Sequence, residues 1–545
     1  MNTYRNETRV FGPPGTGKTT YLTKQIGNAL QKYQPRDILV ASFTKTASRE
    51  LAGRNENMKD YIGTLHSHCY KLIGRPDVVN KDFIKDFNKQ FPVFRLSGAG
   101  FDVSVEEKQA DMVGGQTMGD HLLHEQQVMR AKLIPKDYWK QNVRMFDTAW
   151  EKFKRVHGVI DFVDMIENAL EVDDVPNNAK VGFFDEAQDF TPLEFKVIRK
   201  WSEDMEHIVF SGDDDQLLYS WVGASPESLI DGDANIRVLS QSYRVPKIVQ
   251  EYAEKWIKQV SKRQEKEYKS RDFEGELGHS RASMNNPVRL LRDLEKDLSE
   301  GKSVMVLGSC GYMLDGLVKE LRSAGIPFHN PYRVSNGRWN PIRMGGSFGA
   351  ISDFLRPCGD VWDENRIYTL DELQNWTKIV KSSEVLVRGA KKEMSEILKQ
   401  RANLSEIQVL GWLPDELSLE ELDKLLLDYD FIDCEKPEML RWLESKLLAS
   451  KVDALKYPLE VFRKNDIKNG QLDIKLTVGT IHSVKGGEAD VVYLLPDLSA
   501  SAMQGYNKSG IARDSVIRTM YVGMTRAREK LVLCDSESGY RVKWM

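Results

Sequence analysis

The stretch Val10-Phe11-Gly12-Pro13-Pro14-Gly15-Thr16-Gly17-Lys18-Thr19-Thr20 decides the fold of this chain. It joins a short apolar run to a turn rich in glycine and proline, after which Lys-Thr opens a helical pattern, so it matches G-x-x-x-x-G-K-[ST]. The backbone N–H groups of such a loop wrap phosphate oxygens, and glycines are needed because a Cβ would hold the backbone away from them. The sequence therefore predicts a nucleotide-binding loop rather than a turn without a ligand.

Individual residues of this loop have separate expected roles. The helix that follows turns the positive end of its dipole toward the bound anion. Lys18 is expected to reach the β- and γ-phosphates, and Thr19 is expected to ligate Mg²⁺. The expected nucleotide-binding residues of the loop are Gly12, Pro13, Pro14, Gly15, Thr16, Gly17, Lys18, Thr19 and Thr20.

Short β-rich runs follow the loop at 37–43, 181–184 and 208–210. A strand, phosphate loop, helix and strand in that order predict a parallel sheet of an α/β domain, with its ligand at the carboxyl ends of the strands. The second run ends directly in Asp185 and Glu186. One carboxylate can hold Mg²⁺ while the next orients an attacking water, so Asp185 is the metal candidate and Glu186 the base candidate. A strand that ends in a solvated acidic turn is the alternative interpretation.

A second α/β set is expected from about Ile236, with strands at 304–307, 476–478, 491–495 and 531–533. Mostly helical insertions are expected at about 69–150 and 350–468, the latter with helix-capping signals at Thr369/Glu372 and Ser418/Glu421. A loop or mobile hairpin is expected at 96–119, which is rich in glycine. The basic run from Lys258 to Lys269 is interpreted as a solvated helix face.

Composition narrows the class of protein. The net charge of −4 argues against a broadly basic coat for nucleic acid, so DNA or RNA would have to be held in a local groove. The five cysteines show no C-x-x-C spacing, which predicts reduced thiols rather than a disulfide framework or a metal site. A signal peptide and an apolar run of membrane-spanning length are both absent from the sequence, so we expect a cytoplasmic protein that does not enter a membrane.

Aromatic and polar residues near the strand ends carry weaker signals. Tyr219 and Trp221 follow the run at 208–210 closely and could stack on bases, although such aromatics are more often core residues. Tyr243 and Arg244 place an aromatic beside an arginine, a pair that could stack on a base and reach a phosphate. Thr64 and His66 would as readily be turn and core residues.

Two late stretches complete a pattern: 479–488 reads Gly-Thr-Ile-His-Ser-Val-Lys-Gly-Gly-Glu, and 518–529 contains Gly-Met-Thr-Arg-Ala-Arg-Glu. With these, the chain resembles the superfamily 1 helicases, and within them the UvrD/PcrA/Rep-like group, from Phe11 to Glu529. The resemblance implies two RecA-like motor domains built around a P-loop, each with a mostly helical accessory insertion. The implied parts are 1–70 with 150–235, the insertion 71–149, then 236–349 with 469–545, and the insertion 350–468.

The resemblance also implies roles for single residues. Gln216 matches a glutamine that senses the γ-phosphate, and Arg244 and Arg526 match arginines of the second motor domain that contact this phosphate when the cleft closes. Tyr243 matches an aromatic that stacks on adenine, and Gly486 and Glu488 lie in the motif whose carboxylate approaches the ribose. The positions that match the path of single-stranded DNA are Phe43, Thr64, His66, Tyr219 and Trp221.

The activity implied by the resemblance is that of an ATP-dependent, Mg²⁺-requiring DNA helicase that moves 3′→5′ on single-stranded DNA. The expected substrates are single-stranded DNA and tailed duplexes, with repair or replication proteins as further partners and a monomer or weak dimer as the acting form. One alternative is a DNA-dependent ATPase that strips proteins from DNA or needs a partner to unwind; a more remote one is a remodeller of the AAA+ type. Since no glutamine precedes Gly12, the usual adenine-reading motif is missing, which predicts relaxed base selectivity.

Overall fold

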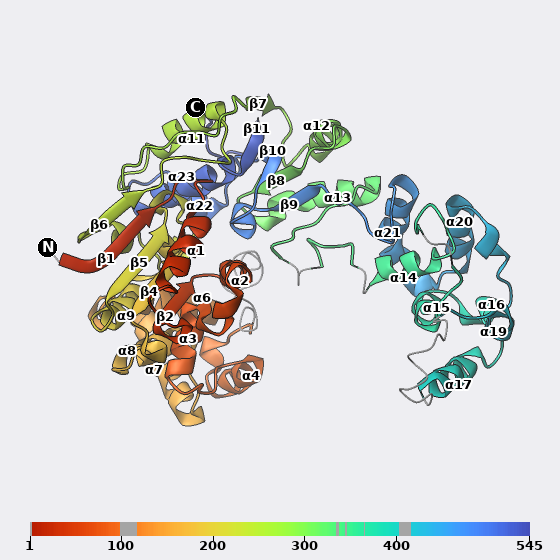
Figure 1. Cartoon of the computed structure of the whole chain (residues 1–545), viewed down its shortest axis with the longest axis horizontal. Helices are drawn as coiled ribbons and strands as arrows, with labels where there is room; N and C mark the ends of the chain where they lie inside the picture. The colour runs from red at the N-terminus through yellow and green to blue at the C-terminus, as the bar shows by residue number, and fades with distance from the viewer. Residues whose placement is uncertain (1–2, 99–116, 334–336, 344–345, 364–365, 403–415) are drawn as a thin grey trace. The chain divides into compact units, whose positions relative to one another are not determined.

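The computed structural model describes residues 3–98, 117–333, 337–343, 346–363, 366–402 and 416–545 (Figure 1). Contacts divide the chain into two compact units. The first contains 1–285, 304–314 and 479–545, and the second contains 286–303 and 315–478. Both parallel sheets contribute strands to the first unit, which therefore contains the residues that the sequence singles out for nucleotide chemistry.

The first sheet has the strand order β3-β2-β4-β5-β1-β6, and its paired strands are parallel. Its strands are β1 (Thr3–Phe11), β2 (Ile38–Ser42), β3 (Ile62–Thr64), β4 (Val181–Asp185), β5 (His207–Gly212) and β6 (Asp233–Val238). The expectation that a second α/β set starts near Ile236 is wrong, because Ile236 pairs with Arg9 at the edge of this first sheet. β1 continues directly into the glycine-rich loop.

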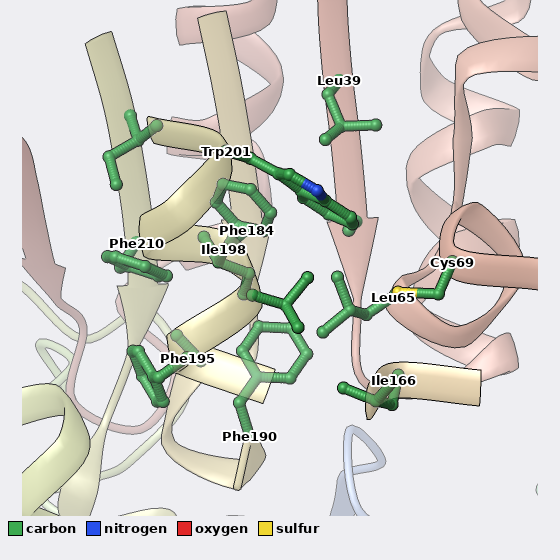
Figure 2. Packing of buried hydrophobic residues seen from close by; sticks show 14 of the residues in the cluster. Leu39, Leu65, Cys69, Ile166, Phe184, Phe190, Phe195, Ile198, Trp201 and Phe210 are labelled. Carbon is green, nitrogen blue, oxygen red and sulfur yellow. The ribbon is translucent and has the colours of Figure 1, made fainter. Parts of the chain in front are cut away.

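Alternate residues of each central strand serve two separate cores, as the two-residue period of a strand requires. Ile38 and Val40 of β2 pack with helices α1 (Lys18–Ala29) and α2 (Lys45–Arg54), whereas Leu39 and Ala41 face the other side. That other core is formed with α3 (Leu65–Leu72), α8 (Phe162–Glu171) and α9 (Pro192–Ser202), and Figure 2 shows Trp201 of α9 beside Leu39 and Phe184. A sheet covered on both faces holds its carboxyl ends as a rigid platform.

The second sheet has the order β7-β11-β10-β8-β9, and β10 lies parallel to both β11 and β8. Its strands are β7 (Glu276–Ser280), β8 (Val304–Gly308), β9 (Leu476–Thr480), β10 (Ala489–Leu494) and β11 (Ala527–Cys534). Helices α11 (Lys247–Ile257) and α23 (Ile511–Met524) pack on each other, and α22 (Ala500–Tyr506) precedes α23. The expected α/β class with two parallel sheets is confirmed.

The segment between α3 and α8 is helical, as expected. It contains α4 (Lys81–Gln90), α6 (Met118–Ala131) and α7 (Gln141–His157), and its core is rich in aromatics, with Phe87, Phe146, Trp150 and Phe153 in mutual contact. Most of the loop expected at 96–119 lies outside the described residues. Gly158 ends α7 in the left-handed conformation, as a C-terminal glycine commonly does.

The second unit is mostly helical. Its helices are α12 (Pro287–Ser299), α13 (Asp315–Ala324), α14 (Ser347–Phe354), α15 (Leu370–Thr377), α16 (Ser382–Val385), α17 (Ala390–Ala402), α19 (Leu419–Leu425), α20 (Lys436–Lys446) and α21 (Val452–Lys464). Both capping boxes predicted from sequence, at Thr369/Glu372 and Ser418/Glu421, are present. Phe354, Trp376, Phe431 and Trp442 form its aromatic core.

The basic run from Lys258 to Lys269 is not the solvated helix face that its charge suggested. α11 ends at Ile257, and the run continues as turns and extended chain. Lys266 is buried, because three carboxylates that are distant in sequence surround its ammonium group. Among the described helices, none combines the length and the apolar character that crossing a membrane requires.

Candidate active site

The loop from Gly12 to Lys18 forms a tight turn between β1 and α1. Gly15 and Gly17 have φ angles of 73° and 76°, in the left-handed region that glycine adopts without strain, and Gly17 is the N-cap of α1. The Thr16 hydroxyl donates to the Pro13 carbonyl at 2.8 Å, and Lys18 Nζ donates to the Gly12 carbonyl at 2.9 Å. The lysine is therefore held over the loop, at the N-terminal end of a helix, where a phosphate would bind.

The two predicted acids stand at the carboxyl end of β4, next to the loop. Asp185 is the last residue of the strand, and Glu186 adopts a φ of 53°, which turns the chain sharply after it. Burial, reinforced by the neighbouring Glu186 charge, raises the pKa of Asp185. Burial also favours the protonated form of Glu186, but the positive charges of Lys485 and then Lys18 outweigh the effect of burial, so the pKa of Glu186 is lowered. The two neighbouring carboxyl groups therefore have pKa values that are shifted in opposite directions.

Lys485 was not singled out as a site residue by sequence, although it lies in the quoted stretch 479–488. Its Nζ is 2.9 Å from Glu186 Oε2 and also contacts Asp189. Gln188 is a second missed residue: its side chain donates to Glu186 Oε2 at 2.6 Å and accepts from the Asp213 N–H at 2.9 Å. Only the tertiary fold brings Lys485 to the base, whereas Gln188 lies two residues after Glu186 in the chain and its residue type alone does not signal the contact.

Arg526 directly precedes β11, and its guanidinium reaches the turn that follows β5 of the first sheet. Its Nη2 donates to Gln216 Oε1 at 3.1 Å, and Gln216 Nε2 in turn donates to Asp213 Oδ2 at 2.7 Å. The arginine is 1% exposed and is also held by the carbonyls of Val522 and Gly487. Two residues that the sequence placed in separate motor domains are thus in direct contact.

The segment that contains Tyr243 and Arg244 packs on the phosphate loop. The Tyr243 N–H donates to the Gly15 carbonyl at 2.8 Å, while its ring is 73% exposed and free to stack on a base. Arg244 Nε donates to Glu488 Oε2 at 2.6 Å. Burial of Glu488 opposes its ionisation, but Arg244 outweighs this and lowers the pKa of the carboxyl group. The predicted residues Tyr243, Arg244 and Glu488 therefore surround one side of the loop.

Comparisons with known proteins agree with this geometry. Residues 1–236 match the UvrD/REP helicase N-terminal domain, and residues 475–534 match the UvrD-like helicase C-terminal domain. The chain is 22% identical to the probable DNA helicase II homolog of Mycoplasma capricolum, over 98% of this chain and 82% of that protein. It is also 22% identical to the ATP-dependent DNA helicase PcrA of Staphylococcus aureus, over 97% of this chain and 81% of that protein.

This chain carries the N-terminal and C-terminal domains of a UvrD-like helicase. Its two parallel sheets are accordingly the RecA-like sheets of two motor domains. The site described above lies where residues of the two sheets meet, and all of its residues belong to the first compact unit.

The helicase's candidate Mg²⁺ ligands fit a hard cation. Asp185 Oδ1 is buried and accepts no hydrogen bond from the described part of the chain, so this oxygen keeps its lone pairs for an ion. Thr19 follows Lys18 in the first turn of α1. No group of three or more His, Cys, Asp or Glu side chains that could hold a metal occurs among the described residues. A protein site of one carboxylate and one hydroxyl suits Mg²⁺, which usually completes its shell with water and substrate phosphates.

The helicase's predicted DNA-contacting aromatics gather at one place. Phe43 and Tyr219 have ring centroids 4.9 Å apart, and Tyr219 lies 6.4 Å from both Trp221 and His482. The indole of Trp221 is also stacked at 6.0 Å on His124 of α6. Tyr219 is only 1% exposed, so the core interpretation fits this residue, whereas Phe43 and Trp221 are partly accessible.

Thr64 and His66 lie at the start of α3 in the helicase. Thr64 is the N-cap, and its hydroxyl accepts from the Ser67 N–H at 3.2 Å, which is the structural role that its residue type suggested. His66 Nδ1 is 3.5 Å from Glu194 Oε1, and the imidazole is partly exposed. Of the remaining predicted residues, Thr20 accepts from Arg54 at 3.1 Å, and Gly486 adopts a φ of 87° before Glu488.

Proposed function

We propose that this helicase hydrolyses ATP between its two sheets and uses the cycle to move 3′→5′ along single-stranded DNA and to separate strands. The match to UvrD/REP-type domains supports the activity. The pattern Thr480-Ile481-His482-Ser483 followed by Lys485-Gly486 supports the direction, because it resembles the 3′→5′ branch.

The contact between Arg526 and Gln216 is the observation that carries the proposal. An arginine supplied to a phosphate site by a second domain offsets the charge that builds up on the transferring phosphoryl group, and such a residue is worth roughly 10³–10⁵ in rate. Because Arg526 directly precedes β11 of the second sheet and Gln216 follows β5 of the first, hydrolysis depends on how the two sheets meet. This dependence couples chemistry to domain movement.

Each residue of the site has a proposed task. Lys18 and the loop amides bind the phosphates. Glu186, which its lowered pKa keeps ionised, accepts a hydrogen bond from the attacking water and orients it. Thr19 and Asp185 would hold Mg²⁺, which would supply positive charge to offset that of the nucleotide phosphates. Arg244 and Arg526 approach the γ-phosphate, Tyr243 stacks on the base, and Glu488 lies near the ribose.

The DNA path is proposed to run over the aromatic group around Phe43 and Trp221. Stacking on aromatics contributes about 1–3 kcal/mol per base and tolerates any sequence, as a translocating enzyme needs. His482, which follows β9, donates from Nε2 to the Leu218 carbonyl at 3.3 Å and lies beside Tyr219. The aromatic group therefore touches both sheets, and base positions and nucleotide state would change together.

The first test is the steady-state ATPase rate with and without single-stranded DNA. We expect strong stimulation by DNA, loss of all turnover in Lys18→Ala, and loss of the stimulation alone in Trp221→Ala. Tyr138→Ala is the matched control, because this tyrosine is 79% exposed, lies in the accessory insertion and is not a member of the aromatic group. A rate that is indifferent to DNA in the wild-type protein would contradict the proposal.

Tailed duplexes test direction and strand separation. A 3′-tailed duplex should be unwound and a 5′-tailed one should not; the reverse preference would refute the direction. Movement on single strands without unwinding would instead favour the alternative, a DNA-dependent translocase that displaces proteins or needs a partner. For this activity we further propose a division into four parts in which the first motor domain extends through β6: 1–70 with 150–238, 71–149, 239–349 with 469–545, and 350–468. We also propose a cytoplasmic location, with repair or replication proteins as partners.

A further inference from the structure

Three consecutive aspartates follow β5, and all of them are buried. Asp213, Asp214 and Asp215 are each at most 1% exposed, yet one ammonium group serves all three. Lys266 Nζ lies 2.9 Å from Asp213 Oδ1 and 3.0 Å from Asp215 Oδ2, and it also contacts Asp214. The side chain of Lys266 is 2% exposed, so solvent screens these interactions little.

The surrounding segment 263–266 adds further contacts to the same loop. Arg263 donates to both oxygens of Asp215, at 2.9 and 2.6 Å, in the two-pronged geometry that arginine favours. The Gln264 N–H donates to Asp214 Oδ2 at 2.9 Å. This segment joins α11 to β7 of the second sheet, whereas the aspartates follow β5 of the first. The cluster therefore fastens a loop of one sheet to the chain that enters the other.

Asp213 connects this cluster to the phosphate sensor. Its Oδ1 faces Lys266, while its Oδ2 accepts from Gln216 Nε2 at 2.7 Å. The other end of the Gln216 amide accepts from Arg526. The orientation of the Gln216 amide is thus set by one donor and one acceptor, and the acceptor is itself held in place by Lys266.

We propose that Lys266 is a positioning residue for ATP hydrolysis: through Asp213 it fixes the side chain of Gln216 toward Arg526. The inference rests on the proposed function, because it assigns a support to a residue of that site. Lys266 does not touch the nucleotide itself. Without its ammonium group, Asp213 loses its charged partner and keeps the Gln216 amide and the Asp215 N–H, and the three neighbouring carboxylates repel one another in a buried place.

The test is a double-mutant cycle on kcat at saturating ATP and single-stranded DNA. Lys266→Met is combined with Asp214→Asn, because the pair of changes leaves the net charge of the cluster unaltered and protects folding. We expect this variant to lower kcat roughly 10- to 100-fold, as a displacement of about 1 Å at a catalytic group does. Lys266→Arg should recover part of the rate, and Lys269→Met, which changes an exposed lysine three residues further along the chain, should keep the wild-type rate.

Coupling to Gln216 separates positioning from a merely structural role. If Lys266 acts through Gln216, adding the Lys266 and Asp214 changes to Gln216→Ala should lower kcat no further than Gln216→Ala alone. If the two sets of changes lowered kcat independently, so that their effects multiplied, the proposal would be overturned. A wild-type rate in the charge-balanced variant, which combines Lys266→Met with Asp214→Asn, would overturn it too.

Hydrogen exchange of the backbone amides 213–217 gives a readout that needs no turnover. Protection should fall in the charge-balanced variant and persist in Lys269→Met. Unchanged protection would overturn the proposed role of Lys266. If the wild-type protein showed no DNA-stimulated ATP hydrolysis, the proposed function would fail, while the exchange experiment would still decide whether Lys266 holds the loop.

Discussion

Gly15→Ala is the substitution for which the structure predicts the sharpest separation of activity from stability. Gly15 has a φ of 73°, and a Cβ placed there would lie 2.4 Å from Arg244 Cβ and 3.0 Å from the Arg244 backbone nitrogen. Carbon atoms pack at about 3.5 to 4.0 Å, so the segment that contains Arg244 would have to retreat by more than about 1 Å. The backbone of alanine in this conformation costs a further ~1–2 kcal/mol.

The expected consequence is a large loss of rate with a small loss of stability. A displacement of about 1 Å at a charged group of the site lowers the rate by about 10²-fold, whereas the strain should lower the apparent Tm by only a few degrees. The matched control is Gly158→Ala, because Gly158 also has a positive φ, of 65°, but no atom lies within 4 Å of the added Cβ. Gly158→Ala should lose about as much stability as Gly15→Ala and should keep the wild-type rate of ATP hydrolysis.

The assay measures kcat and KM for ATP in the presence of single-stranded DNA, together with thermal unfolding of both variants. If Gly15→Ala kept kcat/KM within about threefold of Gly158→Ala, the contact between the phosphate loop and the Arg244 segment would be unimportant for the reaction, and the reasoning would be refuted.

Two further predictions concern buried charges. Burial raises the pKa of Glu194 to about 7 from its usual 4.5, so as pH rises the unfolded chain ionises first and stability falls between about pH 4.5 and 7. Glu194→Gln keeps the acceptor for Thr191 and should raise the free energy of unfolding at pH 8 by up to ~3 kcal/mol but leave it unchanged near pH 4, as urea titrations at the two pH values would reveal. Lys154, 3% exposed and 3.0 Å from Asp161, neutralises buried carboxylates, so Lys154→Met should cost roughly 3–5 kcal/mol in a urea titration. The exposed neighbour change Lys152→Met should alter this value by less than about 0.5 kcal/mol, and equal effects of the two would contradict the assignment.

Local patterns in the sequence predicted the strands and the phosphate loop well, because their geometry depends on neighbours in the chain. The run 181–184 forms β4 and places Asp185 at the carboxyl end of that strand. Both predicted capping boxes are also present, as their spacing indicated. The same kind of reasoning failed for Lys266: its charge suggested solvent, but the three aspartates that bury it lie about fifty residues earlier in the chain. Reasoning from local sequence also assigned Ile236 to the wrong sheet. An edge strand belongs to the sheet whose outer strand it pairs with, and that pairing is not written in the strand's own residues.

The sequence by itself determined the nucleotide loop, the acid pair and the resemblance to a helicase family. Each of these depends on contiguous residues, whose backbone conformation is set mainly by their neighbours in the chain. Only the tertiary structure decided which distant groups meet there. Arg526 reaches Gln216 across 310 positions, Lys485 reaches Glu186, and Lys266 gathers Asp213, Asp214 and Asp215. The physical reason is that a hydrogen bond or ion pair requires its two partners within about 3 Å of each other, and the packing of two separate sheets sets that distance.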